Sequence, residues 1–151
     1  MSRPTTQRAR KSLNPCRCGE DRIWILSVQD SALVIALQRR ATVVLQKSIR
    51  EGFGLTVTEA MWKVTPAIGG NVEGIRHQIE DGVNCFLVDR IGEAAERIVQ
   101  IPKDPELARM LGKKAKETVR ERFLMTRLME EWLDLVGSFE PDFRLKGNLA
   151  A

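Results

Sequence analysis

The segment EGFGLTVTEAMWK, from Glu51 to Lys63, combines residue types that could hold a sugar and a phosphate. Two of its residues are glutamates, Glu51 and Glu59, eight positions apart. Carboxylates accept hydrogen bonds, so a pair of them can bind neighbouring hydroxyls, as acidic residues bind ribose in dinucleotide sites. On spacing alone, the alternative stays open that Glu59 is a solvated helix residue and Glu51 an ordinary loop residue.

Two glycines, Gly52 and Gly54, lie between these glutamates, and their position indicates an anion-binding site. The strand-like run ATVVLQ precedes them, and the residues from Leu55 to Lys63 favour a helix. The start of a helix has free backbone N–H groups and the positive end of the helix dipole. Because glycine has no Cβ, a ligand can come close to the backbone. The segment therefore predicts a phosphate site at the amides from Gly52 to Leu55.

The elements that would position this segment are short apolar strands alternating with helices. The strand-like runs are IWILSV, ATVVLQ, TPAIGG and CFLV. Helical spacing occurs in SALVIALQRRA and again from Ile91 to Ile101. This alternation is typical of an α/β fold in which helices cover both faces of a parallel sheet. Ligands of such sheets bind outside the carboxyl ends of the strands, where Gly52 and Gly54 are expected.

The C-terminal third reads as helices. Asp104 suits a helix N-cap and Pro105 the first helical position, so a helix is predicted from there to Phe123. The run LMTRLMEEWLDLVGSF predicts a last helix with one apolar side, and its Met and Trp residues suit packing.

Composition sets the broad class of the protein. A chain of 151 residues fits one domain, and it has neither a run of about 18 apolar residues nor the apolar centre of a signal peptide. We expect a cytoplasmic protein without a membrane partner, with Cys16, Cys18 and Cys85 as reduced thiols. Disordered tails are expected at residues 1–21 and 140–151. The net charge of +4 resides in the first tail, which has no aromatic residue to stack on bases, so nucleic acid is not the expected partner.

Several segments of the chain resemble those of a known family. EGFGLTVTEAMWKVTPAI resembles the E-x7-E motif of the retaining GT-B glycosyltransferases of group 1 (family 4 type), and GGNVEGIRHQIEDGVNCFLV resembles the segment that follows it. The run LQRRATVVLQKSIREGFGLTVTEAMWK is most similar to the trehalose-forming enzymes of the trehalose synthase type, which use a nucleoside-diphosphate-glucose donor. The resemblance covers residues 23 to 139.

The resemblance implies roles for six residues. Glu51 would be the catalytic residue that contacts the transferred sugar, and Glu59 would hold the ribose hydroxyls of the donor. Gly52, Phe53, Gly54 and Leu55 would bind the donor's diphosphate through their backbone. The donor would be UDP-, ADP- or GDP-glucose, the product would retain the anomeric configuration, and neither a metal nor another cofactor is expected.

The same resemblance implies an incomplete enzyme. Residues 22–139 would form the second half of the C-terminal, donor-binding Rossmann-like domain of a GT-B protein, so we expect no activity from this chain alone. A separate N-terminal half or self-association could complete the cleft. The alternatives are a non-catalytic nucleotide-binding or association module and an anion- or nucleic-acid-binding protein that uses its basic tail.

Three residues depart from the glycines usual in the family, namely Val64, Glu73 and Cys85. A valine at a positive φ costs about 1–2 kcal/mol. We therefore expect Val64→Gly and Cys85→Gly to stabilise the protein if both positions have positive φ. Glu73 would place a negative side chain in the loop that faces the donor.

Overall fold

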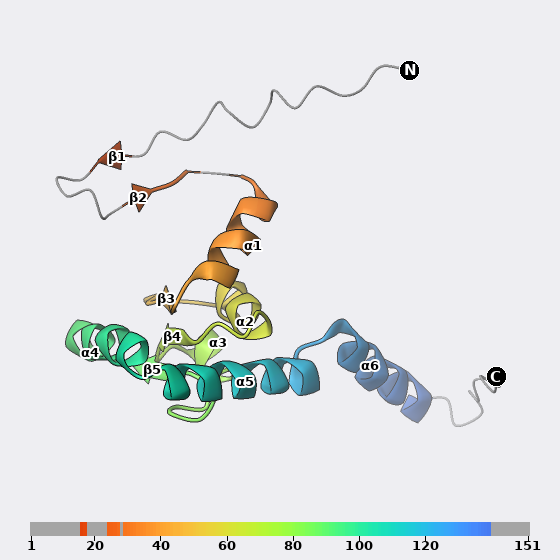
Figure 1. Ribbon diagram of the computed structural model, residues 1–151. Helices are drawn as coiled ribbons and strands as arrows, with labels where there is room; N and C mark the ends of the chain where they lie inside the picture. Colours follow the sequence, from red (N-terminus) through yellow and green to blue (C-terminus); the bar gives the residue numbers. More distant parts are fainter. Residues whose placement is uncertain (1–15, 18–23, 28, 140–151) are drawn as a thin grey trace, which may run out of the picture. The chain divides into compact units, whose positions relative to one another are not determined.

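The computed structural model describes residues 16–17, 24–27 and 29–139 of the chain (Figure 1). The expected disordered tails, apart from residues 16–17, lie outside these residues. The chain divides into two compact units between Ala36 and Leu37, and each is described by itself. The described elements are β1 (Cys16–Arg17), β2 (Trp24–Ile25), α1 (Ser31–Arg40), β3 (Val44–Gln46), α2 (Leu55–Trp62), β4 (Ala67–Gly70), α3 (Glu73–Arg76), β5 (Phe86–Val88), α4 (Ile91–Lys103), α5 (Pro105–Arg122) and α6 (Met125–Phe139).

The first unit contains a two-stranded antiparallel ribbon. Strand β2 pairs with β1, with Trp24 opposite Arg17. The run IWILSV was expected to supply a buried strand of the parallel sheet, but its strand residues pair with β1 instead. The first turn of α1 is capped by Asp30, whose carboxylate accepts from the backbone N–H groups of Ala32 and Leu33 at 2.9 and 3.2 Å.

The second unit contains a three-stranded parallel sheet in the order β3-β4-β5. Val44 is in register with Ala67, and Ile68 with Phe86. The central strand β4 is buried along its whole length. The predicted α/β class with parallel strands and C-terminal helices is confirmed, and three strands make it a partial Rossmann-like sheet.

Apolar clusters cover both faces of the sheet, because successive side chains of a strand point to opposite faces. Ala67 packs in one cluster with residues of α2 and the C-terminal half of α5, including Met61 and Val119. Its neighbour Ile68 packs in the other cluster with α4 and the N-terminal half of α5, including Leu111. Helix α5 therefore contributes to both faces.

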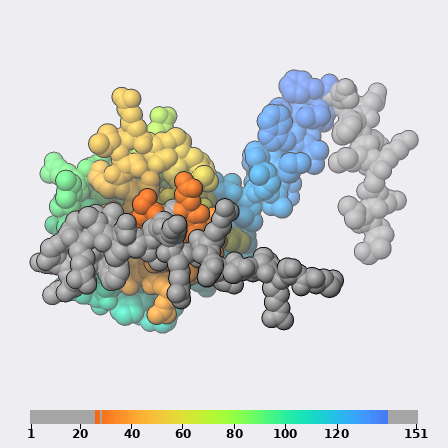
Figure 2. Space-filling view, turned by 90° about the horizontal axis from the view of Figure 1, so that it is seen from above, coloured from red at the N-terminus to blue at the C-terminus, as the bar shows by residue number. Residues whose placement is uncertain are grey.

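Helix α5 begins where the sequence predicted. Asp104 is its N-cap and accepts from the backbone N–H of Leu107 at 3.0 Å, while Pro105 occupies the first turn. Helix α6 differs from expectation, because none of its residues is buried. Figure 2 shows its atoms in blue, open to view along the helix.

Val64 and Cys85, which replace glycines usual in the family, have different backbone conformations. Val64 has a φ of 65° and is the non-glycine residue with positive φ in the described part of the chain. Cys85 does not share this conformation and is fully buried in the cluster under α2. The condition under which Cys85→Gly was expected to stabilise the protein is therefore not met, and that change would empty a packed position.

Candidate functional site

The loop after β3 borders a hollow of about 580 Å³. The loop leaves the carboxyl end of β3, and α3 follows the carboxyl end of β4, so the hollow lies where open α/β sheets bind their ligands. Its lining comes from this loop and from the start of α3, and comprises Ile49, Arg50, Glu51, Gly52, Val72 and Glu73.

Glu51 is half-buried, and two side chains from its own segment hold its carboxylate. Gln46 at the end of β3 donates to Oε2 at 3.1 Å, and the hydroxyl of Ser48 donates to the same oxygen at 3.3 Å. Gln46 also donates to the Ser48 hydroxyl at 2.9 Å. Because these bonds use one oxygen, the second carboxylate oxygen keeps its acceptor capacity for a ligand hydroxyl.

Gln78 ties the loop to the helices around it. Its buried side-chain amide donates to the carbonyl oxygens of Phe53 and Gly74, and its carbonyl accepts from the Thr58 hydroxyl at 2.6 Å. The Phe53 ring stacks edge-to-face on Phe123, with 5.8 Å between ring centroids. The Phe53 side chain is therefore used for packing, and its backbone carbonyl is bonded by Gln78.

Backbone conformation and close contacts explain why two positions of the site are glycines. Gly54, the N-cap of α2, has a φ of 88°, a left-handed conformation that glycine adopts without strain. A Cβ on Gly74 would lie 2.5 Å from the Glu51 carbonyl oxygen, so its absence lets α3 approach the loop. The Gly74 N–H donates to that oxygen at 3.2 Å. A Cβ on Gly52 would meet no atom within 4 Å, so this glycine faces open space.

The start of α2 presents a set of free amides. In the residues that the structure describes, no backbone N–H from Gly52 to Thr56 donates a hydrogen bond, and Val57 is the first to do so, to the Gly54 carbonyl at 2.9 Å. Helix N-termini with such amides attract anions, and the Leu55 side chain, 68% exposed, does not bury them.

The two glutamates occupy different parts of the site. Glu51 lines the hollow, whereas Glu59 is exposed on α2 and does not line it. Gln38 donates to the Glu59 carboxylate at 2.9 Å. Glu59 lies one helical turn after Leu55, about 6 Å along the axis. This offset places a carboxylate next to the anion-attracting end of α2 without putting it in the same hollow as Glu51.

Sequence reasoning set aside or missed several residues that surround Glu51. Arg50 lines the hollow, and the family resemblance assigns it no role. Glu73, expected in a loop that faces the donor, lies instead at the first position of α3, and it lines the hollow. Gln46 and Ser48 have no signal beyond their nearness to Glu51 in sequence.

Neither a metal-binding cluster nor a membrane-spanning helix is found among the described residues. No group of three His, Cys, Asp or Glu side chains is arranged to hold a metal ion in the part of the chain that the structure describes. No described helix is long and apolar enough to cross a membrane.

The partial Rossmann-like sheet and the elements around it are similar to those of solved glycosyltransferase structures with the GT-B fold. Solved structures of that class match the chain over most of its length. HepE of Anabaena, solved in complex with UDP-glucose, has a TM-score of 0.70 at 23% identity, over 79% of this chain and 33% of HepE. This likeness shows the fold.

Sequence similarity assigns the chain to a family within this class. The model of the family "Glycosyl transferases group 1" matches residues 4–118, and the chain belongs to this family. A trehalose synthase of Pyrococcus horikoshii is 53% identical over 105 residues, which are 70% of this chain and 25% of that protein. TarM of Staphylococcus aureus, solved in complex with UDP and other ligands, is 28% identical with a TM-score of 0.63, over 70% of this chain and 22% of TarM. The chain thus spans about a quarter of the length of the trehalose synthases it matches.

Proposed function

We propose that this chain is the donor-binding part of a retaining glucosyltransferase similar to trehalose synthase, and that it binds UDP-, ADP- or GDP-glucose. The observation that carries the proposal is the open start of α2, whose amides from Gly52 to Thr56 are free beside the hollow that Glu51 lines. Trehalose synthases at 49–53% identity and the UDP complex of TarM support the donor class.

The donor's diphosphate would lie at the start of α2. The free amides of Gly52, Phe53, Gly54 and Leu55 would donate to its oxygens, and the helix dipole would favour its charge. As the bond to the anomeric carbon breaks, negative charge grows on the departing diphosphate. Donors already fixed in place stabilise that charge without first having to reorient.

Glu51 would contact the transferred sugar. Gln46 and Ser48 orient its carboxylate by holding Oε2, so the other oxygen can accept from a sugar hydroxyl. Arg50, which lines the same hollow, would offset part of the charge of Glu51 when the diphosphate is bound.

Glu59 would bind the ribose of the donor. A ribose follows directly after the diphosphate, and the separation of about one helical turn between Leu55 and Glu59 suits that order. Carboxylates are known to accept from ribose hydroxyls in dinucleotide sites. Gln38 would keep the Glu59 carboxylate in place through its 2.9 Å hydrogen bond.

We further propose that the 151 residues alone bind the donor without transferring glucose. Transfer requires a second sugar held against the anomeric carbon, and such orientation accounts for roughly 7–11 kcal/mol of a barrier. The hollow at Glu51 is lined by one loop and the start of α3. A further protein part, either a separate N-terminal half or a second copy of the chain, would have to supply the acceptor wall.

A non-catalytic nucleotide-binding or association module is the second candidate, and Glu73 is the observation that favours it. With Glu51 and Glu73 against Arg50, the lining of the hollow carries more negative than positive side chains. This balance weakens the attraction for a diphosphate.

The first test of the proposal is a measurement of donor binding. We expect UDP-, ADP- or GDP-glucose to bind at roughly millimolar affinity, about −4 kcal/mol, in calorimetry and ligand-detected NMR. Glu59→Ala should weaken binding, and Glu96→Ala, an exposed glutamate on α4, should not. Absence of contact at several millimolar of each donor, or equal binding by Glu59→Ala, would remove the proposal.

Transfer is tested separately with a radiolabelled donor and with glucose, fructose and glucose phosphate as acceptors. The chain alone should give no product above background. Acceptor-dependent product that disappears in Glu51→Gln would show that the chain completes its own site.

A further inference from the structure

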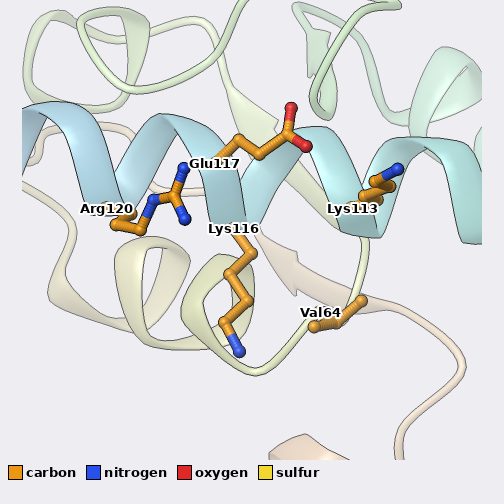
Figure 3. A pocket seen from close by; sticks show the side chains of 5 residues that line it. All are labelled: Val64, Lys113, Lys116, Glu117 and Arg120. Carbon is orange, nitrogen blue, oxygen red and sulfur yellow. The ribbon is translucent and has the colours of Figure 1, made fainter.

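A second hollow, of about 210 Å³, lies on α5 beside the turn between α2 and β4 (Figure 3). We name it the α5 basic pocket; its lining residues are Val64, Lys113, Lys116, Glu117 and Arg120. The turn leads into the amino end of β4, whereas the hollow at Glu51 is at the carboxyl ends of the strands. The α5 basic pocket is therefore separate from the candidate donor site.

The backbone fixes the shape of this pocket. A Cβ on Gly112 would lie 2.2 Å from the Val64 carbonyl oxygen, so the glycine lets α5 lie directly against the turn. Lys113, Lys116 and Arg120 follow one another at intervals of three and four positions, so they share one side of α5. In Figure 3 the Lys116 side chain extends from α5 toward the turn that carries Val64.

The pocket has unpaired positive charge. Lys113, Lys116 and Arg120 make no ion pair with any residue that the structure describes. Glu117 is already bonded by Lys114 at 3.1 Å, and this hydrogen bond, followed by the charges of Lys114, Lys113 and Arg120, lowers the pKa of its carboxyl. Glu117 thus stays ionised with a partner of its own, and three cations remain available.

An aromatic side chain borders one of these cations. The Lys116 ammonium lies 5.1 Å from the centroid of the Trp62 ring, which is 41% exposed. A cation over an aromatic face is held electrostatically, so the ring helps to place the ammonium beside the turn.

We propose that the α5 basic pocket binds a small organic anion with two or more negative charges, either a phosphate compound or a polycarboxylate. Three cations without partners attract such charges, and charge-assisted hydrogen bonds from Lys and Arg are the strong ones. The volume is below the range of roughly 300–1,000 Å³ typical of pockets that bury drug-sized ligands, so the pocket suits a small anion. The proposal does not depend on the proposed transferase function.

The test is an NMR titration of the ¹⁵N-labelled chain with inorganic pyrophosphate and, separately, with citrate, at constant ionic strength. We expect saturable shifts at the Trp62 indole and at the amides of residues 113–120, with Trp62→Phe used to assign the indole signal. The two arms distinguish a phosphate compound from a polycarboxylate.

Charge variants test whether the lining residues of the pocket determine the affinity for the anion. Lys116→Gln and Arg120→Gln should each weaken binding about threefold, since exposed charge pairs contribute below about 1 kcal/mol. Glu117→Gln should strengthen binding by a similar factor. Arg109→Gln is the matched control, because Arg109 is an exposed cation of the same helix that is paired with Glu106 and does not line the pocket.

Three results would overturn the proposal. Shifts that rise linearly without saturation would mean that neither anion binds, and an equal loss in Arg109→Gln would mean a general charge effect. Shifts confined to the amides of residues 52–56 would place the anion at α2 alone. Circular dichroism of each variant shows whether its fold is intact, and the single substitutions are on the surface, where folding tolerates them.

Discussion

Val64→Gly tests whether the left-handed backbone of the α2–β4 turn stores strain. Val64 has a φ of 65°, and a β-branched residue in that region costs about 1–2 kcal/mol. Glycine removes this cost but loses about 0.5–1 kcal/mol through the greater freedom of the unfolded chain, and it also loses the packing of a half-buried valine. We therefore expect the free energy of unfolding to stay the same or to rise by up to about 1 kcal/mol.

Val83→Gly is a matched control for this variant. Val83 is 43% exposed, as is Val64, and each valine donates its N–H to a carbonyl three residues earlier at 3.0 Å. Val83 lacks the positive φ. Both substitutions lose the same side chain and gain the same chain entropy, so their difference isolates the backbone strain. Val64→Gly should be more stable than Val83→Gly by about 1–2 kcal/mol.

The assay is urea unfolding followed by circular dichroism, with thermal unfolding as a second measure. A difference of 1 kcal/mol corresponds to roughly 2–4 °C in Tm for a chain of about 150 residues. Equal losses in the two variants would refute the reasoning and would mean that the turn relaxes around an ordinary dihedral angle at Val64.

Three further predictions concern single side chains. Gln78→Leu should lower the free energy of unfolding by about 1–3 kcal/mol in urea unfolding, because it leaves the buried partners of that amide unbonded; an unchanged midpoint would contradict this. Burial raises the pKa of Cys85 to about 12, so iodoacetamide should label Cys85 in urea but not in the native chain at pH 7, as mass spectrometry of the peptide would show. Backbone N–H groups of Asp89 and then Arg90 lower the pKa of Glu93, so its stabilisation is complete above about pH 4.5 and is lost as the pH falls through the lowered value. The Tm of Glu93→Ala should therefore be lower than that of the parent at pH 7 and should converge on it at low pH; a constant difference would exclude the effect.

Local signals in the sequence predicted several features. The pair Asp104-Pro105 is sufficient to start α5, because capping needs only the first turn of the helix. The strand runs around Ile68 and Phe86 predicted parallel strands, and both residues are buried in the sheet.

Features that depend on distant partners could not be predicted. Gln78 bonds Phe53 and Thr58, which precede it by 25 and 20 residues, so no local pattern marks its role. The apolar side of α6 was expected to pack, but a hydrophobic pattern does not specify a partner, and the helix has no buried residue. In α4, for which the sequence predicted helical spacing from Ile91 to Ile101, Ala94 and Ile101 are buried, whereas Ile98 is 36% exposed. Pattern alone therefore does not fix which turn of that helix meets the sheet.

The Gln78 amide has a consequence for the thermodynamics of ligand binding. A glycine-containing loop that first became ordered around its ligand would lose conformational entropy in that step, and the affinity would fall accordingly. Here the Phe53 carbonyl and the Gly74 carbonyl are joined by one side chain before any ligand arrives. The loop is thus ordered when the chain folds, and an anion that reaches the amides at α2 meets a backbone that has little freedom left to lose.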